Sequence, residues 1–261
     1  MALLSSTALF ETQALTVGIG EKIFCKALDL KLNAGERLAI LGRNGAGKST
    51  LLSVLAGLRQ PKSGKVLLEG MTYAALGERQ SAKIRGWLPQ AKGDAFAATV
   101  LETAMVGRHP HVDRLAWESA KDLDIVRQAL GAMELAEFEK RDIQTLSGGE
   151  RQRLSIATLL AQSPRLFLLD EPTTYLDLKH QILTLELFSN LARESEAAII
   201  MVLHEPGLAW RFCDSALLVY GDGATESGAI QEMLTVERLS RLYQYPLQKL
   251  EENGLVSFIP G

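Results

Sequence analysis

The nine residues GRNGAGKST, at positions 42–50, have the types and spacing of a phosphate-binding loop. Such a loop has a glycine, four variable residues, a second glycine, a lysine and a hydroxyl residue in this order. Its backbone N–H groups curl around a polyphosphate, and the next helix adds the positive end of its dipole. We therefore predict a nucleotide site that consists of Gly42, Asn44, Gly45, Ala46, Gly47, Lys48, Ser49 and Thr50. In it, Lys48 would reach the β- and γ-phosphates, and the Ser49 hydroxyl would ligate Mg²⁺.

Three further polar residues follow apolar runs. RLFLLDEP (165–172) ends in Asp170 and Glu171, and AAIIMVL (197–203) is followed by His204. Alone, two solvated carboxylates and a structural histidine would be the simpler interpretation. Beside a phosphate loop, Asp170 is suited to hold Mg²⁺, commonly through a water, and Glu171 to polarise the water that attacks the γ-phosphate. His204 is then expected to contact the γ-phosphate.

The stretch TLSGGERQR (145–153) predicts a second helix start suited to an anion. Ser147 and Glu150 have the spacing of a capping box, in which each side chain bonds the other's backbone N–H. Gly148 and Gly149 each destabilise a helix turn by about 1 kcal/mol relative to alanine. This cost makes sense if another molecule must approach the backbone closely. A single chain, however, already has one phosphate loop.

The elements that would position these residues alternate between strand and helix. RLAIL (37–41), RLFLLD and AAIIMVLH are apolar throughout, as expected of parallel strands buried on both faces. Helical patterns at 48–58 and 178–195 separate them, which indicates an α/β fold with a central, mostly parallel sheet. Because ligands bind beyond the carboxyl ends of such strands, the loop, the two carboxylates and His204 should form one site.

Two other regions have a different pattern. Residues 10–36 and 65–70, with a turn at 61–64, are predicted to be shorter strands of an antiparallel flank. Residues 92–163 are predicted to be mostly helical, notably at 117–138, and to form a lobe inserted into the core. Residues 1–12 have no basic leader, so we expect a frayed start and an edge strand rather than a signal peptide.

Composition excludes several classes of protein. The 261 residues have a net charge of −3, which argues against a nucleic-acid partner, and 47% are hydrophobic. The longest apolar run is far shorter than the roughly 20 residues that cross a bilayer. Cys25 and Cys213 are isolated, as expected of reduced core thiols. We therefore expect a cytosolic protein, unless a membrane protein recruits it.

Taken in order, GRNGAGKST, LPQ (88–90), LSGGERQR, LLDEPTTYLD (168–177) and MVLHE (201–205) resemble the ATPase subunit of an ABC transporter over nearly the whole chain. The resemblance implies a P-loop ABC-ATPase fold in one domain, 1–261, and two copies that bind ATP head to tail. Its core would be 10–91 and 164–235 with the antiparallel flank, its helical lobe 92–163 and its tail 236–261. Gln90 would be the Q-loop glutamine and a magnesium ligand, Asp177 the D-loop aspartate, and His204 the switch histidine.

A narrower resemblance concerns VGRHPH (106–111) and ERLSRLYQYPLQKL (237–250), which are similar to cassettes of importers for iron–siderophores, haem and cobalamin. It implies peripheral binding to separate permease subunits at the cytoplasmic face of the membrane, and an indirect partnership with a substrate-binding protein. The alternative is a soluble ABC ATPase without a permease, as in iron–sulfur assembly.

The sequence departs from the family in one binding residue. The family usually has an aromatic residue where LTVGIG (15–20) has Ile19, and that residue stacks on adenine. Ile19 offers apolar contact without stacking, which is worth about 1–3 kcal/mol per base in nucleic-acid systems. We expect weaker ATP affinity and poorer base discrimination. TTYLD (173–177), where the family more often has TSALD, is a milder departure.

Overall fold

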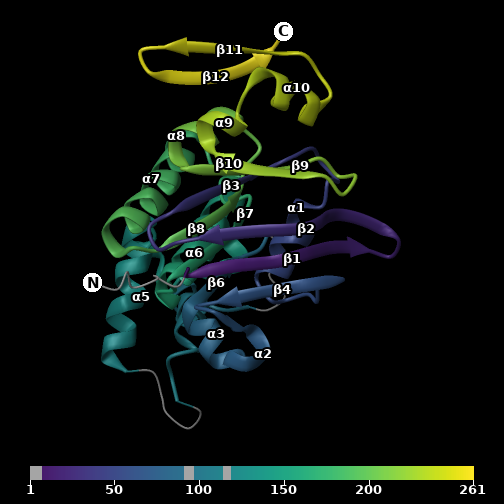
Figure 1. The fold of residues 1–261 in the computed structure, drawn as a ribbon. Helices are drawn as coiled ribbons and strands as arrows, with labels where there is room; N and C mark the ends of the chain where they lie inside the picture. The colour runs from purple at the N-terminus through teal and green to yellow at the C-terminus, as the bar shows by residue number, and fades with distance from the viewer. Residues whose placement is uncertain (1–7, 91–96, 114–118) are drawn as a thin grey trace, which may run out of the picture.

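A mixed six-stranded sheet forms the centre of the computed structural model, which describes residues 8–90, 97–113 and 119–261 (Figure 1). The strand order is β10-β9-β3-β8-β7-β6. The three predicted apolar runs are neighbouring parallel strands: β3 (Arg37–Leu41), β8 (Ala198–Val202) and β7 (Leu166–Asp170). β6 (Arg85–Leu88) and β9 (Ser215–Val219) extend the sheet in parallel, and β10 (Thr225–Ala229) closes one edge antiparallel. The predicted fold class is confirmed.

The antiparallel flank is also confirmed, but the prediction of shorter strands was wrong. β1 (Phe10–Ile19) and β2 (Lys22–Leu32) are the longest strands among the described residues, with 10 and 11 residues. With β4 (Ser63–Leu68) and β5 (Met71–Thr72) they form a sheet in the order β2-β1-β4-β5. Ala14 and Ala27 adopt positive φ at register shifts between the strands. These bulges interrupt the alternation of buried and exposed residues, so the sequence pattern indicates shorter segments.

Helices α4 (Val100–Met105), α5 (Ala120–Ala132) and α6 (Gly148–Gln162) lie between β6 and β7 along the chain, with short 3₁₀ turns η1 (Val106–Arg108), η2 (Ala136–Phe138) and η3 (Ile143–Thr145). The helix predicted at 117–138 was too long, because α5 ends at Ala132 and Glu134 turns to positive φ. Residues 117 and 118 lie outside the described ranges. The division of the chain at 92 and 163 remains a prediction.

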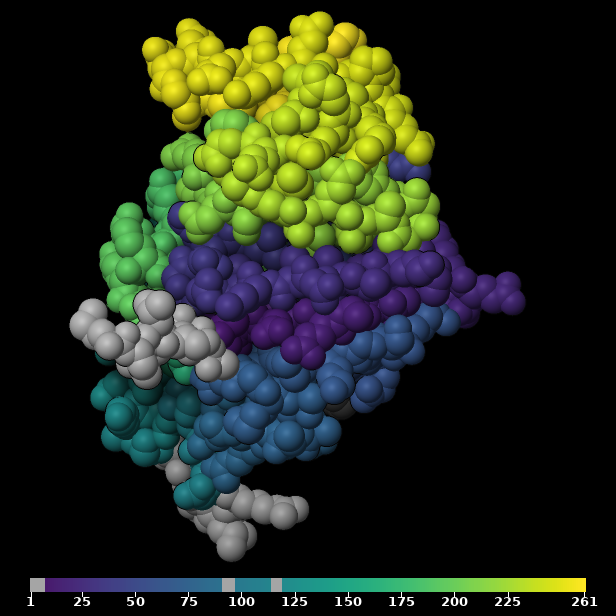
Figure 2. Space-filling model, viewed as in Figure 1, coloured from purple at the N-terminus to yellow at the C-terminus, as the bar shows by residue number. Residues whose placement is uncertain are grey.

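Two helices match their predicted positions closely: α1 (Lys48–Leu55) and α7 (Leu178–Ser195). α2 (Tyr73–Leu76) and α3 (Glu78–Ile84) precede β6. Toward the C-terminus, α8 (Pro206–Phe212), α9 (Ile230–Met233) and α10 (Val236–Tyr243) lead to a hairpin of β11 (Leu247–Glu252) and β12 (Leu255–Pro260). The hairpin contacts α8 through Trp210 and Phe258, whose rings lie 6.2 Å apart edge to face. Figure 2 shows this C-terminal part, in yellow, at one end of the molecule.

The central sheet separates two apolar cores. Alternate strand residues, such as Phe167 and Met201, face a core shared with the helices between β6 and β7. Their neighbours, such as Leu168 and Ile200, face α1 and the antiparallel flank. This burial on both faces explains why the parallel strands are apolar at every position. No helix in the described ranges is long and apolar enough to cross a membrane.

Candidate nucleotide site

The phosphate loop connects β3 to α1 and depends on its glycines. Gly47, the N-cap of α1, has φ of 92°, and a Cβ there would lie 2.3 Å from the ring of Phe24. A Cβ on Gly42 would lie 2.5 Å from the carbonyl oxygen of Val219. Glycine is therefore required at both positions by close packing, and at Gly47 also by backbone conformation. Asn44 and Gly45 are exposed at the turn, Ala46 is buried, and Thr50 lies in the first turn of α1.

Lys48 is 6% exposed, and its ammonium group folds back onto the loop. It donates to the carbonyl oxygens of Gly42, at 2.8 Å, and Arg43, at 3.1 Å. Burial lowers its pKa, and the negative charges of Glu171 and Asp170 oppose this shift. A buried cation that is held only by carbonyl oxygens would gain strongly from an anion, so this geometry suits a phosphate contact.

Ser49 and Asp170 place two oxygen donors side by side. The Ser49 hydroxyl donates to Asp170 Oδ1 at 3.1 Å, and Asp170 is 2% exposed at the end of β7. Burial raises the pKa of Asp170, with the Ser49 hydrogen bond acting against this shift. A hydroxyl and a buried carboxylate are hard donors that fit Mg²⁺, which takes one or two carboxylates together with water and phosphate oxygens.

Glu171 contacts two other predicted catalytic residues, His204 and Gln90. Its Oε1 lies 2.7 Å from His204 Nε2, and its Oε2 accepts from Gln90 Nε2 at 3.1 Å. Thr174 Oγ1 donates to the same Oε2 at 3.2 Å. These four residues come from the ends of β6, β7 and β8 and from the loop after β7, as expected of one site at one sheet edge. Nothing in the sequence pattern had singled out Thr174.

The capping box of α6 is formed as predicted. Ser147 Oγ accepts from the Glu150 backbone N–H at 3.2 Å, and Glu150 Oε2 accepts from the Ser147 N–H at 2.6 Å. Ser147 and Gly148 are exposed. Among the described residues, no hydrogen bond or ion pair joins Ser147, Gly148 or Gly149 to the phosphate loop. The structure therefore keeps the two anion-type helix starts separate within one chain.

The glycine pair is approached by the chain's own loop. A Cβ on Gly149 would lie 3.0 Å from the Tyr175 carbonyl oxygen, and one on Gly148 would lie 3.7 Å from the Tyr175 side chain. We call residues 173–177 the D-loop. The tight approach at Gly149 is thus an intramolecular reason for one of the two glycines, which the sequence did not indicate, whereas a Cβ on Gly148 would make an ordinary van der Waals contact. Asp177, at the end of this loop, is exposed and caps α7 by accepting from the His180 N–H at 2.9 Å.

Ile19, at the end of β1, is 49% exposed. Its contact with a base is a prediction that stands on the family resemblance. Phe24, by contrast, is 7% exposed and packs directly on Gly47 of the phosphate loop. The sequence pattern did not single out Phe24, so sequence reasoning missed this contact.

Comparisons with known proteins show the family to which this chain belongs. The family model described as ABC transporter matches residues 25–174. The petrobactin import ATP-binding protein FpuD of Bacillus anthracis is 40% identical over 88% of this chain and 84% of its own length. The hemin import ATP-binding protein HmuV of Myxococcus xanthus is 39% identical over 87% of this chain and 86% of its own.

Two solved structures are similar over most of the chain. A metal-chelate type ABC transporter in an inward-facing conformation has a TM-score of 0.85 and 30% identity, covering 97% of this chain and 98% of its own. A dimeric ATP-binding cassette, MJ0796, bound to ADP and Pi has a TM-score of 0.73 and 26% identity, covering 85% and 98%. This chain belongs to the ABC transporter family, as an ATP-hydrolysing cassette.

Proposed function

We propose that this cassette powers the import of an iron–siderophore, haem or cobalamin-type chelate through separate permease subunits. Relatives that are named for petrobactin and hemin import, each matched over more than four fifths of its length, support this cargo class. The role of Glu171 in ATP hydrolysis is supported by one observation: Gln90, Thr174 and His204 all contact its carboxylate. A soluble role without a permease is the second candidate.

The chemistry follows from residue geometry. Lys48 would exchange its two carbonyl acceptors for phosphate oxygens when ATP enters the loop. Ser49 and Asp170, with the Gln90 side-chain oxygen, would hold Mg²⁺, which neutralises phosphate charge when it is bound. Glu171 would accept a proton from the attacking water, and His204 and Gln90 hold its carboxylate in place.

The exposed start of α6 supports a head-to-tail dimer. Ser147 and Gly148 form an anion-type helix start that the chain's own phosphate loop does not use. In a twofold pair, each copy would present this start to the nucleotide that the other copy holds, so both helix starts have a ligand. Asp177 would lie at the same interface. The similar cassette MJ0796 was solved as a dimer.

A groove between β6 and α6 offers a place for the permease. It is lined by Trp87, Pro89, Val106, Leu154 and Thr158, among others, and Val106 is 66% exposed. Pro89 directly precedes Gln90, so a permease segment in this groove would lie one residue from a side chain that contacts Glu171. Such docking places the cassette at the cytoplasmic face of the membrane, where a substrate-binding protein would deliver cargo from the other side.

Glu171→Gln tests the enzymatic part. The amide keeps the size of the side chain but cannot serve as a base, so the ATPase kcat should fall at least about a hundredfold while ATP still binds. The measurement is steady-state phosphate release together with binding of a fluorescent ATP analogue. Turnover near the wild-type rate would remove Glu171 from the proposed role.

Transport is tested separately in proteoliposomes. The cassette is reconstituted with candidate permease subunits, and uptake of ferric siderophore, haem and cobalamin is measured with wild-type protein and with Glu171→Gln. ATP-dependent uptake of one of these chelates by wild type alone is the expected result. Normal ATPase activity without a membrane partner in pull-downs from solubilised membranes would favour the soluble alternative.

A further inference from the structure

Glu134, just after α5, has a backbone conformation that normally favours glycine. Its φ is 55°, in the left-handed region, where an L-residue is strained relative to glycine. Such a conformation persists when surrounding contacts fix it. The side chain of Glu134 is exposed, so burial of apolar surface does not explain the choice of residue. The polar contacts of the side chain and backbone must therefore account for it.

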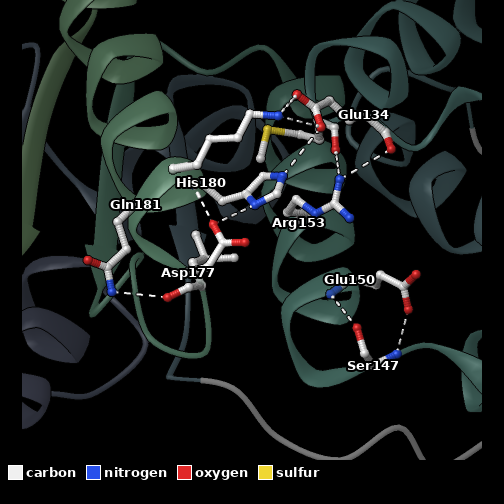
Figure 3. A network of polar contacts seen from close by, with 10 residues as sticks. Glu134, Ser147, Glu150, Arg153, Asp177, His180 and Gln181 are labelled. Carbon is white, nitrogen blue, oxygen red and sulfur yellow. Dashed lines mark hydrogen bonds and ion pairs between the residues drawn. The ribbon is translucent and has the colours of Figure 1, made fainter.

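The carboxylate of Glu134 reaches the start of α7, directly after the D-loop. Lys179 Nζ donates to Oε1 at 2.9 Å and to Oε2 at 3.2 Å. His180 Nε2 lies 3.4 Å from Oε2, and His180 Nδ1 lies 2.8 Å from Asp177 Oδ1. Figure 3 shows the His180 ring between the two carboxylates. Lys179 and His180 hold the pKa of Glu134 below its usual value, so the carboxylate stays charged.

The backbone of the same residue is fixed to α6. Arg153 Nη1 donates to the carbonyl oxygens of Met133, at 2.7 Å, and Glu134, at 3.2 Å. Arg153 lies in the second turn of the helix that Ser147 caps, and the two residues appear on this helix in Figure 3. Glu134 thus connects α6, the helix that Ser147 caps, with the start of α7, where His180 contacts Asp177.

A second connection lies on the other side of the D-loop. The side chain of Gln152, which is 2% exposed, donates to the Pro172 carbonyl oxygen at 2.9 Å. Tyr175 packs against Gly148 and Gly149. The D-loop is therefore connected to α6 at both of its ends. Gln152 of α6 bonds Pro172, just before the loop, and Glu134 connects α6 to the start of α7, just after the loop.

We propose that Glu134 is a positioning residue, which fixes Asp177 and the D-loop relative to the start of α6 so that both meet the second copy's nucleotide as one unit. The inference rests on the proposed dimer. In that dimer, Ser147 and Asp177 act on the nucleotide of the other copy, so an error in their relative placement lowers turnover. The nucleotide that the chain holds in its own loop is unaffected, because among the described residues no hydrogen bond or ion pair joins Glu134 to residues 42–50.

The substitution Glu134→Gly separates positioning from stability. Glycine relaxes the backbone at φ of 55°, and the exposed ion pair it removes contributes little to folding. We expect the unfolding temperature to stay within about 2 °C of wild type or to rise. The KM for ATP should stay the same, and kcat should fall about three- to tenfold. Glu134→Gln keeps an acceptor for Lys179 and should recover part of the lost kcat.

The matched control is Glu139→Gln. Glu139 accepts from Arg127 Nε at 2.9 Å in another partly exposed pair that starts from α5, but this pair does not reach the D-loop. Its kcat should equal that of wild type. Unchanged kcat in Glu134→Gly, or an equal fall in Glu139→Gln, would overturn the positioning role. Wild-type protein without ATPase activity would instead contradict the proposed function.

Discussion

At the residue scale, the fixed spacing of the phosphate loop made its glycines and Lys48 predictable. Gly47 has a local reason to be glycine, its positive φ, and a long-range one, its close contact with Phe24 of β2. Gln90 was a weak candidate for the site from its sequence pattern alone, because a glutamine near a turn is usually a surface residue. Its hydrogen bond to Glu171 depends on parallel pairing of β6 with β7, which no local pattern specifies. The contact of Phe24 with the phosphate loop was missed for the same reason, because it joins two distant segments of the chain. Thr174 lies only three residues after Glu171, but its hydrogen bond depends on the conformation of the loop after β7.

Ile19→Tyr should strengthen ATP binding. Ile19 is 49% exposed at the end of β1, so the larger ring is accommodated, and stacking on a base is worth about 1–3 kcal/mol. In steady-state assays, the KM for ATP should fall at least about fivefold, and the KM for GTP should change by a different factor. Leu58→Tyr, at a site that is 55% exposed beyond α1, is the control. Equal KM values for wild type and Ile19→Tyr would refute the assignment of Ile19 to the base site.

At the element scale, the sequence predicted which elements exist more reliably than their lengths. The three buried parallel strands were clear because both faces are apolar, whereas bulges at Ala14 and Ala27 disguised the long hairpin. The stretch VGRHPH was singled out only by resemblance, and the structure gives it a physical role. Arg108, 7% exposed, donates to Asp122 at 2.8 Å and to the Ala161 carbonyl oxygen at 2.7 Å. It thereby joins η1 to α5 and α6.

Asp122→Asn should destabilise the fold in a pH-dependent way. Hydrogen bonds from Ser119 and Arg108 lower the pKa of Asp122 to about 2. A depressed carboxyl pKa stabilises the folded state above the unfolded pKa, near 4, and this contribution is lost as the pH falls toward 2. The variant also leaves the Arg108 charge unpaired, so at pH 7 the free energy of unfolding should drop by about 3 kcal/mol.

Urea unfolding at pH 7 and at pH 3.5 or below measures this effect, because the lower pH lies below the pKa of about 4 that Asp122 has in the unfolded chain. The difference between wild type and Asp122→Asn should narrow at the lower pH. Asp113→Asn is the control, because Asp113 pairs with Arg79 on the surface and should change stability by less than about 1 kcal/mol. A difference that is the same at both pH values would contradict the assigned role of the Asp122 pair.

At the scale of the whole molecule, the two helix starts that the sequence marks as anion sites, at Gly47 and at Ser147, are not joined by any hydrogen bond or ion pair among the described residues. Ser147 starts α6 with a complete capping box, yet this start is exposed and bonded to its own helix. The sequence could reveal this surplus but not its arrangement, because a second copy of the chain is needed to give it a ligand. ATP is therefore expected to be hydrolysed between two copies of the chain.

The most direct measurement is the ATPase rate of Ser147→Arg. ATP should still bind to the single chain, measured with a fluorescent analogue, while phosphate release should fall at least about a hundredfold because the second copy can no longer close on the nucleotide. Ser119→Arg, which removes an equivalent N-cap from α5, controls for the lost cap and should keep most of the activity. Hydrolysis by Ser147→Arg at the wild-type rate would contradict the account.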